Sequence, residues 1–474
     1  MYEGNFNAFI VASLLFLLIA VYTGRSISSV KEYFHRTGDI DWFLSLSAAN
    51  ITLGTGVVYY LSSSGRFGWL MLLSPLMVLT GYLLFARLLT KRQNLQSSTE
   101  GNFLKWIDAQ IVPLPDSRFR RVSFFPTLSL VLTFILILAY EIYASATIFS
   151  QILFKASDSQ TTIFLAALIA VITMIYALWG GVVAVLKTDR IQIIGVVAVI
   201  FLLIYATFVK VSDPAYQFSA TLLPNSSEIF WGVSAAICGA IATQFYSLLN
   251  WGAVSNFPTG HCPSKTLRAT GISTFILLGA LVLVGLYAGG GHAGVSFKSL
   301  VDAPFLASPG MLTYALVAGM VCIVFSTADS LMIQITMFTY DNLLGRNSMS
   351  DTTSLPSVRN LRLLALGTFT LALSAVIVFI ATQQDLLYLL FAVAGGIIVY
   401  APFMFIALVI AKNPKALSAL EGLPSFGFFA LFLLAFAANI GALIFKPELT
   451  AMVVTLSFVV ASMGAFLLYK RTQV

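Results

Sequence analysis

The amino-acid sequence predicts an all-α membrane protein that crosses the bilayer about thirteen times. Of its 474 residues, 59% are hydrophobic and only 9% are charged, whereas soluble domains carry roughly 25% charged residues. Apolar stretches of about twenty residues, the length that spans the hydrocarbon core as a helix, recur along the chain. The net charge of +7 is divided among loops, so it indicates a lipid bilayer and not nucleic acid as the partner.

The first apolar span is expected to remain in the protein as a helix. It is preceded by Glu3 and by no lysine or arginine, whereas a signal peptide needs a basic amino-terminal region and a small-residue cleavage site. The thirteen expected spans lie near residues 6–23, 42–64, 68–90, 124–153, 161–179, 190–209, 229–251, 271–289, 311–341, 363–382, 386–411, 425–445 and 450–469.

The basic residues predict the orientation of these spans. If the amino terminus lies outside, 21 of the 26 Lys and Arg residues fall on the cytoplasmic side. Cytoplasmic loops carry such an excess of basic residues. We therefore expect the amino terminus outside and the carboxyl terminus inside.

The second span contains a polar, glycine-containing stretch at residues 46–56, with Asn50, Thr52, Gly54 and Gly56. Glycine and small residues weaken a helix, and Asn and Thr can hydrogen-bond a loosened backbone. Unpaired backbone groups inside a bilayer are tolerated only where they line a cavity or are buried in protein. An unwound turn would offer carbonyl oxygens to a cation such as sodium. A close helix–helix contact is the alternative explanation.

The ninth span carries a cluster of oxygen ligands. Ser326, Asp329 and Ser330 share one helical face because they are spaced by three and four residues, and Thr327 lies to one side. Hydroxyls and a carboxylate without nitrogen or sulfur ligands suit an alkali cation better than zinc. Hydrogen bonds between helices are the competing explanation.

A third motif runs from Gly180-Gly181 to Thr188-Asp189. The Gly-Gly pair is expected to end one span, and Asp189 is expected to open the next helix. Asp189 would then be a residue favoured by the helix dipole, with Thr188 as a possible cap. Alternatively, Asp189 would receive a cation that leaves Ser326 and Thr327 toward the cytoplasm.

Two further positions are candidates for the solute cavity. Glu141 lies midway along the fourth span, where an ionised carboxylate is costly. It is expected to face a wet cavity, carry a proton, bind a cationic substrate group or form a structural pair. The segment 243–246, with Gln244 and Phe245, offers polar and aromatic side chains that would line a cavity or simply pack.

No catalytic motif is evident: the sequence has no HExxH, GxSxG or Walker A pattern. An enzyme is not expected, and neither is ATP-driven pumping by this chain alone.

The combination of motifs resembles the sodium:solute symporter family, which includes sodium/glucose, proline, pantothenate and sialic acid transporters. The likeness covers about residues 25–470. The segments that carry it are Val30–Phe34 with Asp41-Trp42, Ala48–Ile51, Gly180-Gly181 through Thr188-Asp189 and Gln192, Ser326–Ser330 with Phe338–Asp341, and Ala401–Phe403 with Lys412-Asn413.

The resemblance implies a five-plus-five inverted repeat of the leucine-transporter type, with solute and ion bound near the midplane at broken helices. The division it implies is an extra helix in 1–24, a first repeat in 25–211, a second repeat in 212–415 and two extra helices in 416–474.

The resemblance also implies which residues bind. The principal sodium site would use carbonyls of Ala48, Ile51 and Ile323 and hydroxyls of Ser326 and Thr327. Some members have a second site, which maps to Asp189, Asp329 and Ser330. This chain has Asp329 where some members have serine, so the two carboxylates would hold a second cation or share a proton. The solute candidates are Asn50, Thr52, Thr55, Ser74, Glu141, Gln244 and Phe245.

The function expected from these features is sodium-coupled symport of a small organic solute by alternating access, with Na⁺ as coupling ion and no organic cofactor. Glu141 favours an amino acid, an amine or another zwitterion, since an acidic-substrate member has an arginine near its place. The alternatives are a proton-coupled transporter, a sugar or organic-acid sodium symporter, and a solute sensor that does not transport. A bacterial inner membrane is the expected location, and a monomer or weak oligomer the expected state.

Overall fold

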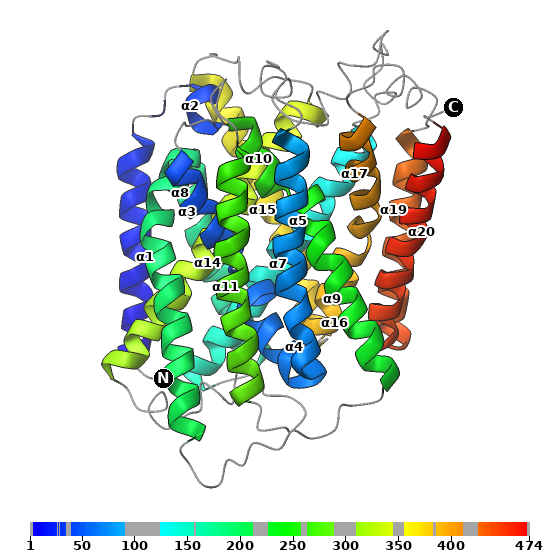
Figure 1. The fold of residues 1–474 in the computed structure, drawn as a ribbon. Helices are drawn as coiled ribbons and strands as arrows, with labels where there is room; N and C mark the ends of the chain where they lie inside the picture. The colour runs from blue at the N-terminus through cyan, green and yellow to red at the C-terminus, as the bar shows by residue number, and fades with distance from the viewer. Residues whose placement is uncertain are drawn as a thin grey trace.

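A computed structural model describes residues 3–25, 27, 29–34, 39–90, 124–155, 158–211, 226–256, 263–288, 310–344, 355–382, 385–410 and 425–471. Every regular element in these ranges is a helix, which confirms the predicted all-α fold class. The helices form one bundle whose long axes run roughly parallel, with the chain termini at opposite ends (Figure 1).

In the described residues, the first half of the chain contains ten helical elements. They are α1 (Glu3–Gly24), α2 (Val30–Phe34), α3 (Asp39–Ala49), the π-helix η1 (Leu53–Val58), α4 (Tyr59–Phe67), the 3₁₀-helix η2 (Gly68–Leu72), α5 (Leu73–Thr90), α7 (Phe124–Phe154), α8 (Ser159–Val211) and α9 (Ser226–Tyr246).

The described part of the second half contains ten more elements. They are α10 (Leu248–Asn256), α11 (Ser264–Ala288), α14 (Met311–Phe338), the π-helix η5 (Thr339–Leu343), α15 (Leu355–Thr382), α16 (Leu386–Gly395), the 3₁₀-helix η6 (Ile397–Val399), α17 (Tyr400–Ile410), α19 (Ser425–Phe445) and α20 (Leu449–Arg471).

Each of the thirteen predicted spans coincides with helix, but helices and spans do not correspond one to one. Within the described residues, nine helices are long and apolar enough to cross a membrane, or ten if the pair bent by 44° at Gly396 counts as one span. Two predicted spans both lie within α8. The helix Ile40–Ala49 is short because the second span is broken. The number thirteen therefore stays a prediction.

The inverted repeat and its boundaries also stay predictions. The boundary at 211/212 coincides with the end of α8, whereas the boundary at 415/416 and the pair Lys412-Asn413 lie outside the described residues.

The centre of the bundle is occupied by α14 and α7. In their most apolar windows, 89% of the α14 residues and 72% of the α7 residues are buried by other helices, against 28% for α1 and for α20. A helix that is apolar all round and buried all round is a core helix. The polar residues that α14 and α7 carry are therefore held inside protein.

The crossing of α8 and α14 is unusually close because it is made by two glycines. A Cβ at Gly195 would lie 2.6 Å from the Cβ of Cys322, and a Cβ at Gly319 would lie 3.0 Å from the Gly195 carbonyl oxygen. Small residues at membrane helix crossings allow the backbones to approach. This approach sets the polar segment of α14 against the segment of α8 that holds Asp189.

Local sequence signals explain where several helices begin and change direction. Asp385 caps α16 by accepting a hydrogen bond from the Leu387 amide at 2.8 Å. Asp158 accepts from the Thr161 amide at 2.8 Å at the start of α8, and this bond lowers the pKa of Asp158. Within α8 the helix is interrupted at Gly181, whose φ of 54° is accessible mainly to glycine.

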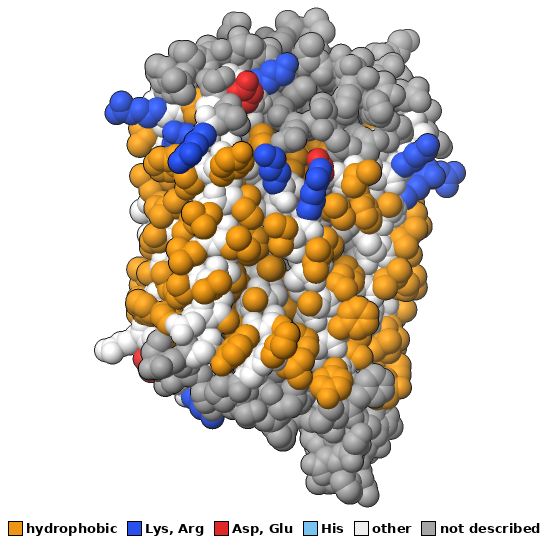
Figure 2. All heavy atoms as spheres, turned by 90° about the vertical axis from the view of Figure 1, so that its left-hand side faces the viewer, with side chains coloured by type: hydrophobic (Ala, Val, Ile, Leu, Met, Phe, Trp, Pro, Cys, Tyr) orange, Lys and Arg blue, Asp and Glu red, His pale blue; other side chains and the backbone are white. Residues whose placement is uncertain are grey.

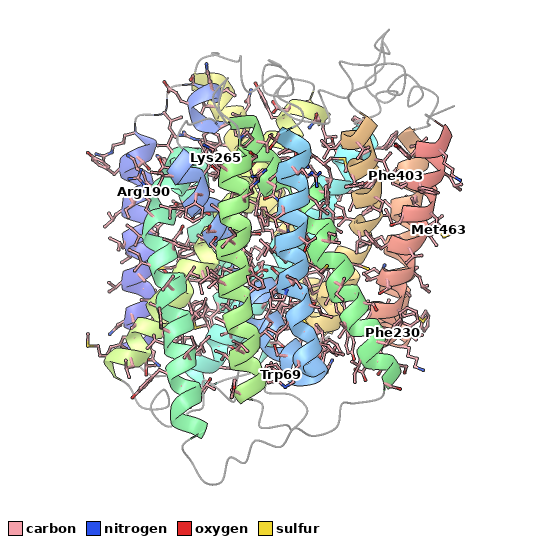
Figure 3. All side chains as sticks on the ribbon, in the orientation of Figure 1. Trp69, Arg190, Phe230, Lys265, Phe403 and Met463 are labelled. Carbon is pink, nitrogen blue, oxygen red and sulfur yellow. The ribbon has the colours of Figure 1, made fainter. Side chains whose placement is uncertain are left out.

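The outer surface shows the pattern expected of a protein in a bilayer. On the face in Figure 2, hydrophobic side chains form a broad band, and Lys and Arg gather near the end that holds the carboxyl terminus. Trp69 and Phe230 lie toward the opposite end (Figure 3), and 52% and 61% of their surfaces are exposed. The predicted orientation stays a prediction, and this distribution supports it.

Candidate functional site

The second predicted span is broken in the middle. Helix α3 ends at Ala49, Thr52 is extended with φ −82° and ψ 163°, and the chain resumes helical form at Leu53. The Ile51 amide turns back to the Ala48 carbonyl at 3.0 Å instead of continuing the α-helical pattern. The break lies where the sequence concentrates Asn, Thr and Gly, as expected from their low helix propensity.

The amides freed by this break are held by Glu141 of α7. Its Oε2 accepts from the Gly54 amide at 2.8 Å, and its Oε1 accepts from the Thr55 amide at 2.8 Å. Only 3% of the Glu141 surface is exposed. Two charge-assisted bonds at the positive end of a half-helix offset much of the cost of a buried carboxylate. The structure thus shows Glu141 paired with backbone amides and also in the wall of the cavity described below, and its predicted roles in binding a cation or carrying a proton stay predictions.

The seventh predicted span is interrupted at Ser247, between α9 and α10. Here the freed groups are carbonyls. Asn250 Nδ2 donates to the Gln244 carbonyl at 3.2 Å, and Trp251 Nε1 donates to the Phe245 carbonyl at 2.8 Å. The interruption is thus satisfied by side chains from the next turn of the same span.

Tyr82 of α5 connects the two breaks. Its hydroxyl accepts from Asn50 Nδ2 at 2.8 Å and donates to Asn250 Oδ1 at 3.0 Å. Asn250 Nδ2 also donates to Gln244 Oε1 at 3.0 Å. Because Asn50 lies at the first break and Asn250 follows the second, one chain of side-chain hydrogen bonds spans both.

A cavity of about 210 Å³ lies between the two breaks and α14. Drug-sized ligands occupy pockets of roughly 300–1,000 Å³, so this cavity suits a small solute. Its polar side chains come from the first break, from α5, α7, α9 and α11, and from α14. They are Asn50, Thr52, Thr55, Ser74, Glu141, Thr243, Gln244, Ser247, Thr274 and Thr327.

Aromatic side chains form two groups on the wall of the cavity. The Tyr59 ring packs edge-on against Tyr60 at 5.0 Å and against Phe391 at 6.2 Å. The Phe134 and Tyr246 rings pack edge-on at 6.4 Å. Sequence reasoning did not single out Tyr59, Tyr60, Phe134 or Phe391 among the 39 Phe and 18 Tyr residues of the chain.

The hydroxyls of α14 face two ways. Thr327 lines the cavity, and its Oγ1 donates to the Ile323 carbonyl at 3.2 Å. Ser326 is fully buried, and its Oγ donates to Asp189 Oδ1 of α8 at 2.8 Å. Ser326, a predicted ligand of the principal sodium site, therefore hydrogen-bonds Asp189, a predicted ligand of the second cation site.

The residues predicted for the second cation site form a cluster of buried oxygens. Tyr176 and Ser330 lie next to Asp329, and Ser45 and Ser326 lie next to Asp189. Asp189 and Asp329 are fully buried. Among the described residues, no hydrogen-bond partner of good geometry faces Asp189 Oδ2, either Asp329 oxygen or Ser330 Oγ. Buried polar atoms without partners are rare in folded proteins. Four such oxygens together have the chemistry of a cation or proton site.

One sequence expectation about this region is wrong. Asp189 does not open a helix with Thr188 as its cap, because helical structure already resumes after Gly181. Thr188 instead donates to the Ala184 carbonyl at 2.9 Å and contacts the Tyr176 hydroxyl. The position of Asp189 inside the helix is what points its side chain at Ser326.

The remaining candidates are distributed as follows. Phe245 does not line the cavity, because its ring packs against Phe85 and Phe405 at 5.8 and 5.5 Å. Ala48, Ile51 and Ile323 are fully buried. Helix α14 packs against both α3 and η1, so the segments that carry the proposed sodium ligands are neighbours.

Ion pairs anchor the outer ends of the first broken helix. Arg190 of α8, labelled in Figure 3, donates from Nε to Asp41 Oδ1 at 2.8 Å near the start of α3. At the other end of the broken helix, Arg66 of α4 lies 3.5 Å from Asp385. The Arg190 side chain is 58% exposed, so its pair is screened by solvent.

No protein-family model and no curated protein sequence matches this chain. Solved structures do match it. A Na⁺-coupled sialic acid symporter, in a substrate-bound outward-open state, superposes with a TM-score of 0.65 at 15% identity, covering 98% of each chain. Mhp1, a nucleobase-cation-symport-1 family transporter in a closed conformation, gives 0.54 at 12% identity, over 93% of this chain and 94% of Mhp1.

A manganese transporter of Eremococcus coleocola, in complex with an aromatic bis-isothiourea compound, gives a TM-score of 0.54 at 13% identity, over 92% of this chain and 95% of the transporter. At these identities the likeness establishes the fold. The chain thus shares the leucine-transporter-like helical fold of these transporters over nearly its whole length. Membership of the sodium:solute symporter family stays a prediction.

Proposed function

We propose that the protein is a secondary active transporter that carries a small organic solute together with sodium by alternating access. The observation that carries this proposal is the meeting of the first broken helix with α14 at one cavity: Asn50 and Thr52 line it from one side and Thr327 from the other. Broken helices around a midplane cavity are the usual solute and ion site of this kind of fold.

The residues present fit a sodium ion. The principal site would be formed by the carbonyls of Ala48, Ile51 and Ile323 and the hydroxyls of Ser326 and Thr327. Carbonyls at an unwound turn are the ligands that such folds offer to sodium. The second site would be formed by Asp189, Asp329 and Ser330, which contribute four buried oxygens without a close hydrogen bond among the described residues. The sialic acid symporter, which has the same fold, is Na⁺-coupled, and sodium is therefore the first ion to test.

Proton coupling is the second candidate, because Asp189 of α8 and Asp329 of α14 are two fully buried carboxylates on helices that pack against each other. Burial disfavours the ionisation of both, so a single shared proton is chemically reasonable. Glu141 fits a proton carrier less well than sequence alone implies, because both of its oxygens already accept backbone hydrogen bonds.

Uptake by the purified chain in proteoliposomes tests these proposals. We expect solute accumulation to require an inward sodium gradient and to be unaffected by a proton gradient. Accumulation driven by protons in sodium-free buffer would favour the second candidate. If no solute that binds the protein is accumulated under either gradient, the proposal of transport is overturned.

The double substitution Ser326→Ala plus Thr327→Ala tests the sodium site. We expect sodium affinity to fall by at least about tenfold, since two oxygen ligands are lost. The matched control is Thr370→Ala plus Ser374→Ala on α15, where two exposed hydroxyls bond only their own helix. Unchanged sodium affinity in the first double variant would disprove the proposed ligands.

A further inference from the structure

The only acidic residue among the described residues that line the cavity is Glu141, and that described lining includes no Lys, Arg or His. A solute carboxylate in the cavity would therefore meet no cationic side chain from this lining. It would instead meet the charge of Glu141. The charge pattern of the lining already distinguishes solutes by their charge.

The place that a carboxylate would otherwise take is filled by the protein itself. The positive amino end of a half-helix is where such folds bind anionic substrate groups. Here the Gly54 and Thr55 amides at that end donate to Glu141 Oε2 and Oε1. A solute carboxylate would have to displace a buried glutamate that makes two charge-assisted bonds.

Glu141 retains the capacity to attract a cation. An ionised carboxylate has about four acceptor positions. The two amides use two of them, and the Thr52 and Thr55 hydroxyls also hydrogen-bond to Glu141, but none of these neutral partners removes its charge. The half-helix end contributes about half a positive charge, which leaves a net negative charge beside the cavity. Glu141 itself forms part of the cavity wall.

The aromatic wall provides the rest of the recognition. The Tyr59–Phe391 pair and the Phe134–Tyr246 pair present rings to the cavity. Ring faces attract ammonium groups, and aromatic cages are a common means of binding substituted ammonium ligands. Hydroxyls such as Ser74 and Thr243 can accept or donate to a neutral polar end of the solute.

We propose that the solute is a small organic ammonium ion that carries no carboxylate, with Glu141 and the aromatic wall as its recognition elements. This inference rests on the proposed function and narrows it, because amino acids and other carboxylate-bearing zwitterions are excluded from the class expected from sequence.

Matched pairs of probes test the inference on the wild-type chain. Choline and glycine betaine differ chiefly in an alcohol against a carboxylate, as do ethanolamine and glycine. Ligand binding stabilises the folded state, so thermal shifts and competition binding are measured in sodium and in potassium buffer. We expect the ammonium alcohol of at least one pair to bind at least about tenfold more tightly than its carboxylate partner. Equal or tighter binding of the carboxylate members, or no binding of either ammonium alcohol, would overturn the inference.

The substitution Glu141→Ala sharpens the test, because it frees the Gly54 and Thr55 amides. We expect weaker binding of the ammonium alcohol and a gain in binding of its carboxylate partner, which supplies the missing acceptor. Unchanged preference in a folded Glu141→Ala protein would contradict the role of Glu141. If that variant does not fold, the wild-type pairs decide alone.

The two proposals fail in distinguishable ways. Sodium-driven uptake of glycine betaine but not of choline into proteoliposomes would leave symport standing and overturn the solute class. Tight binding of choline without its accumulation would leave the solute class standing and overturn symport.

Discussion

The two broken helices satisfy their freed backbone groups differently. At the first break, the amides at the start of η1 bond a side chain of α7. At the second break, the carbonyls at the end of α9 bond side chains of α10, in the same span. Glu141 lies 87 and 86 residues from the amides it accepts, and Asn250 and Trp251 lie six residues from the carbonyls they bond. The second break is therefore a local feature of one span. The position of the first break is set by its own sequence, but its freed amides are satisfied by α7, so its stability and its ligand preference depend on tertiary structure.

The largest expected difference between the breaks comes from removing Glu141. In Glu141→Ala, two buried amides lose a charged acceptor, and each unsatisfied group costs about 1–3 kcal/mol. We expect the free energy of unfolding to fall by the sum of the two, measured by thermal and denaturant unfolding in detergent. The free energy of unfolding of Glu141→Gln should lie between those of the wild type and Glu141→Ala, since the glutamine amide keeps one acceptor oxygen.

Glu448→Gln is the matched control for charge removal, because Glu448 is exposed between α19 and α20. We expect no change beyond about 0.5 kcal/mol. A Glu141→Ala protein as stable as this control would show that the freed amides find water or other partners, and the contrast between the two breaks would disappear.

A smaller effect is expected from crowding the first break instead of removing its partner. A Cβ at Gly54 would lie 2.9 Å from Glu141 Oε2, 2.9 Å from the Tyr140 ring and 3.0 Å from the Ala144 Cβ. We expect Gly54→Ala to destabilise the protein by about 1–3 kcal/mol, as overpacking does.

The control for this substitution is Gly367→Ala on α15, where an added Cβ meets no atom within 4 Å. Removing a glycine from a helix interior stabilises by roughly 0.5–1 kcal/mol. The two variants should thus shift the unfolding temperature in opposite directions. Shifts of the same sign and size would mean that the neighbours of Gly54 move aside without cost.

The smallest effect is expected at the second break. Trp251→Phe removes the donor to the Phe245 carbonyl but keeps an aromatic ring against Phe85, which Trp251 packs on at 4.9 Å. One neutral hydrogen bond contributes about 0.5–1.5 kcal/mol. Trp69→Phe, at a half-exposed position, is the control. A loss as large as that of Glu141→Ala would show that the second break is no more local than the first.

The sequence was sufficient to predict where the first break lies, because the signal is local. Asn50, Thr52, Gly54 and Gly56 lower helix propensity within one stretch, and the helix does end at Ala49. The hydroxyl and carboxylate cluster on α14 was visible for the same reason, since its spacing places it on one helical face.

The partner of Glu141 could not be predicted from sequence. The groups it bonds are backbone amides, which every residue except proline possesses, and they lie on another helix. The aromatic wall was also invisible, since Tyr59 and Phe391 look like ordinary membrane residues until the fold sets them side by side. Asp189 was misplaced because the next helix begins directly after the interruption at Gly181 and not near residue 190.

The hydrogen bonds of Glu141 also determine which part of the first broken span is able to pivot. They fasten the start of η1, and with it the half of the span formed by η1 and α4, to α7. A swing of α3 relative to α7 would therefore be absorbed at Asn50–Thr52, where the helix is interrupted and Thr52 is extended. The ion pair of the exposed Arg190 with Asp41 joins the start of α3 to α8, and breaking this pair costs about 1 kcal/mol or less. Helix α3 also packs against α8 and α11, so its movement would require these contacts to shift as well.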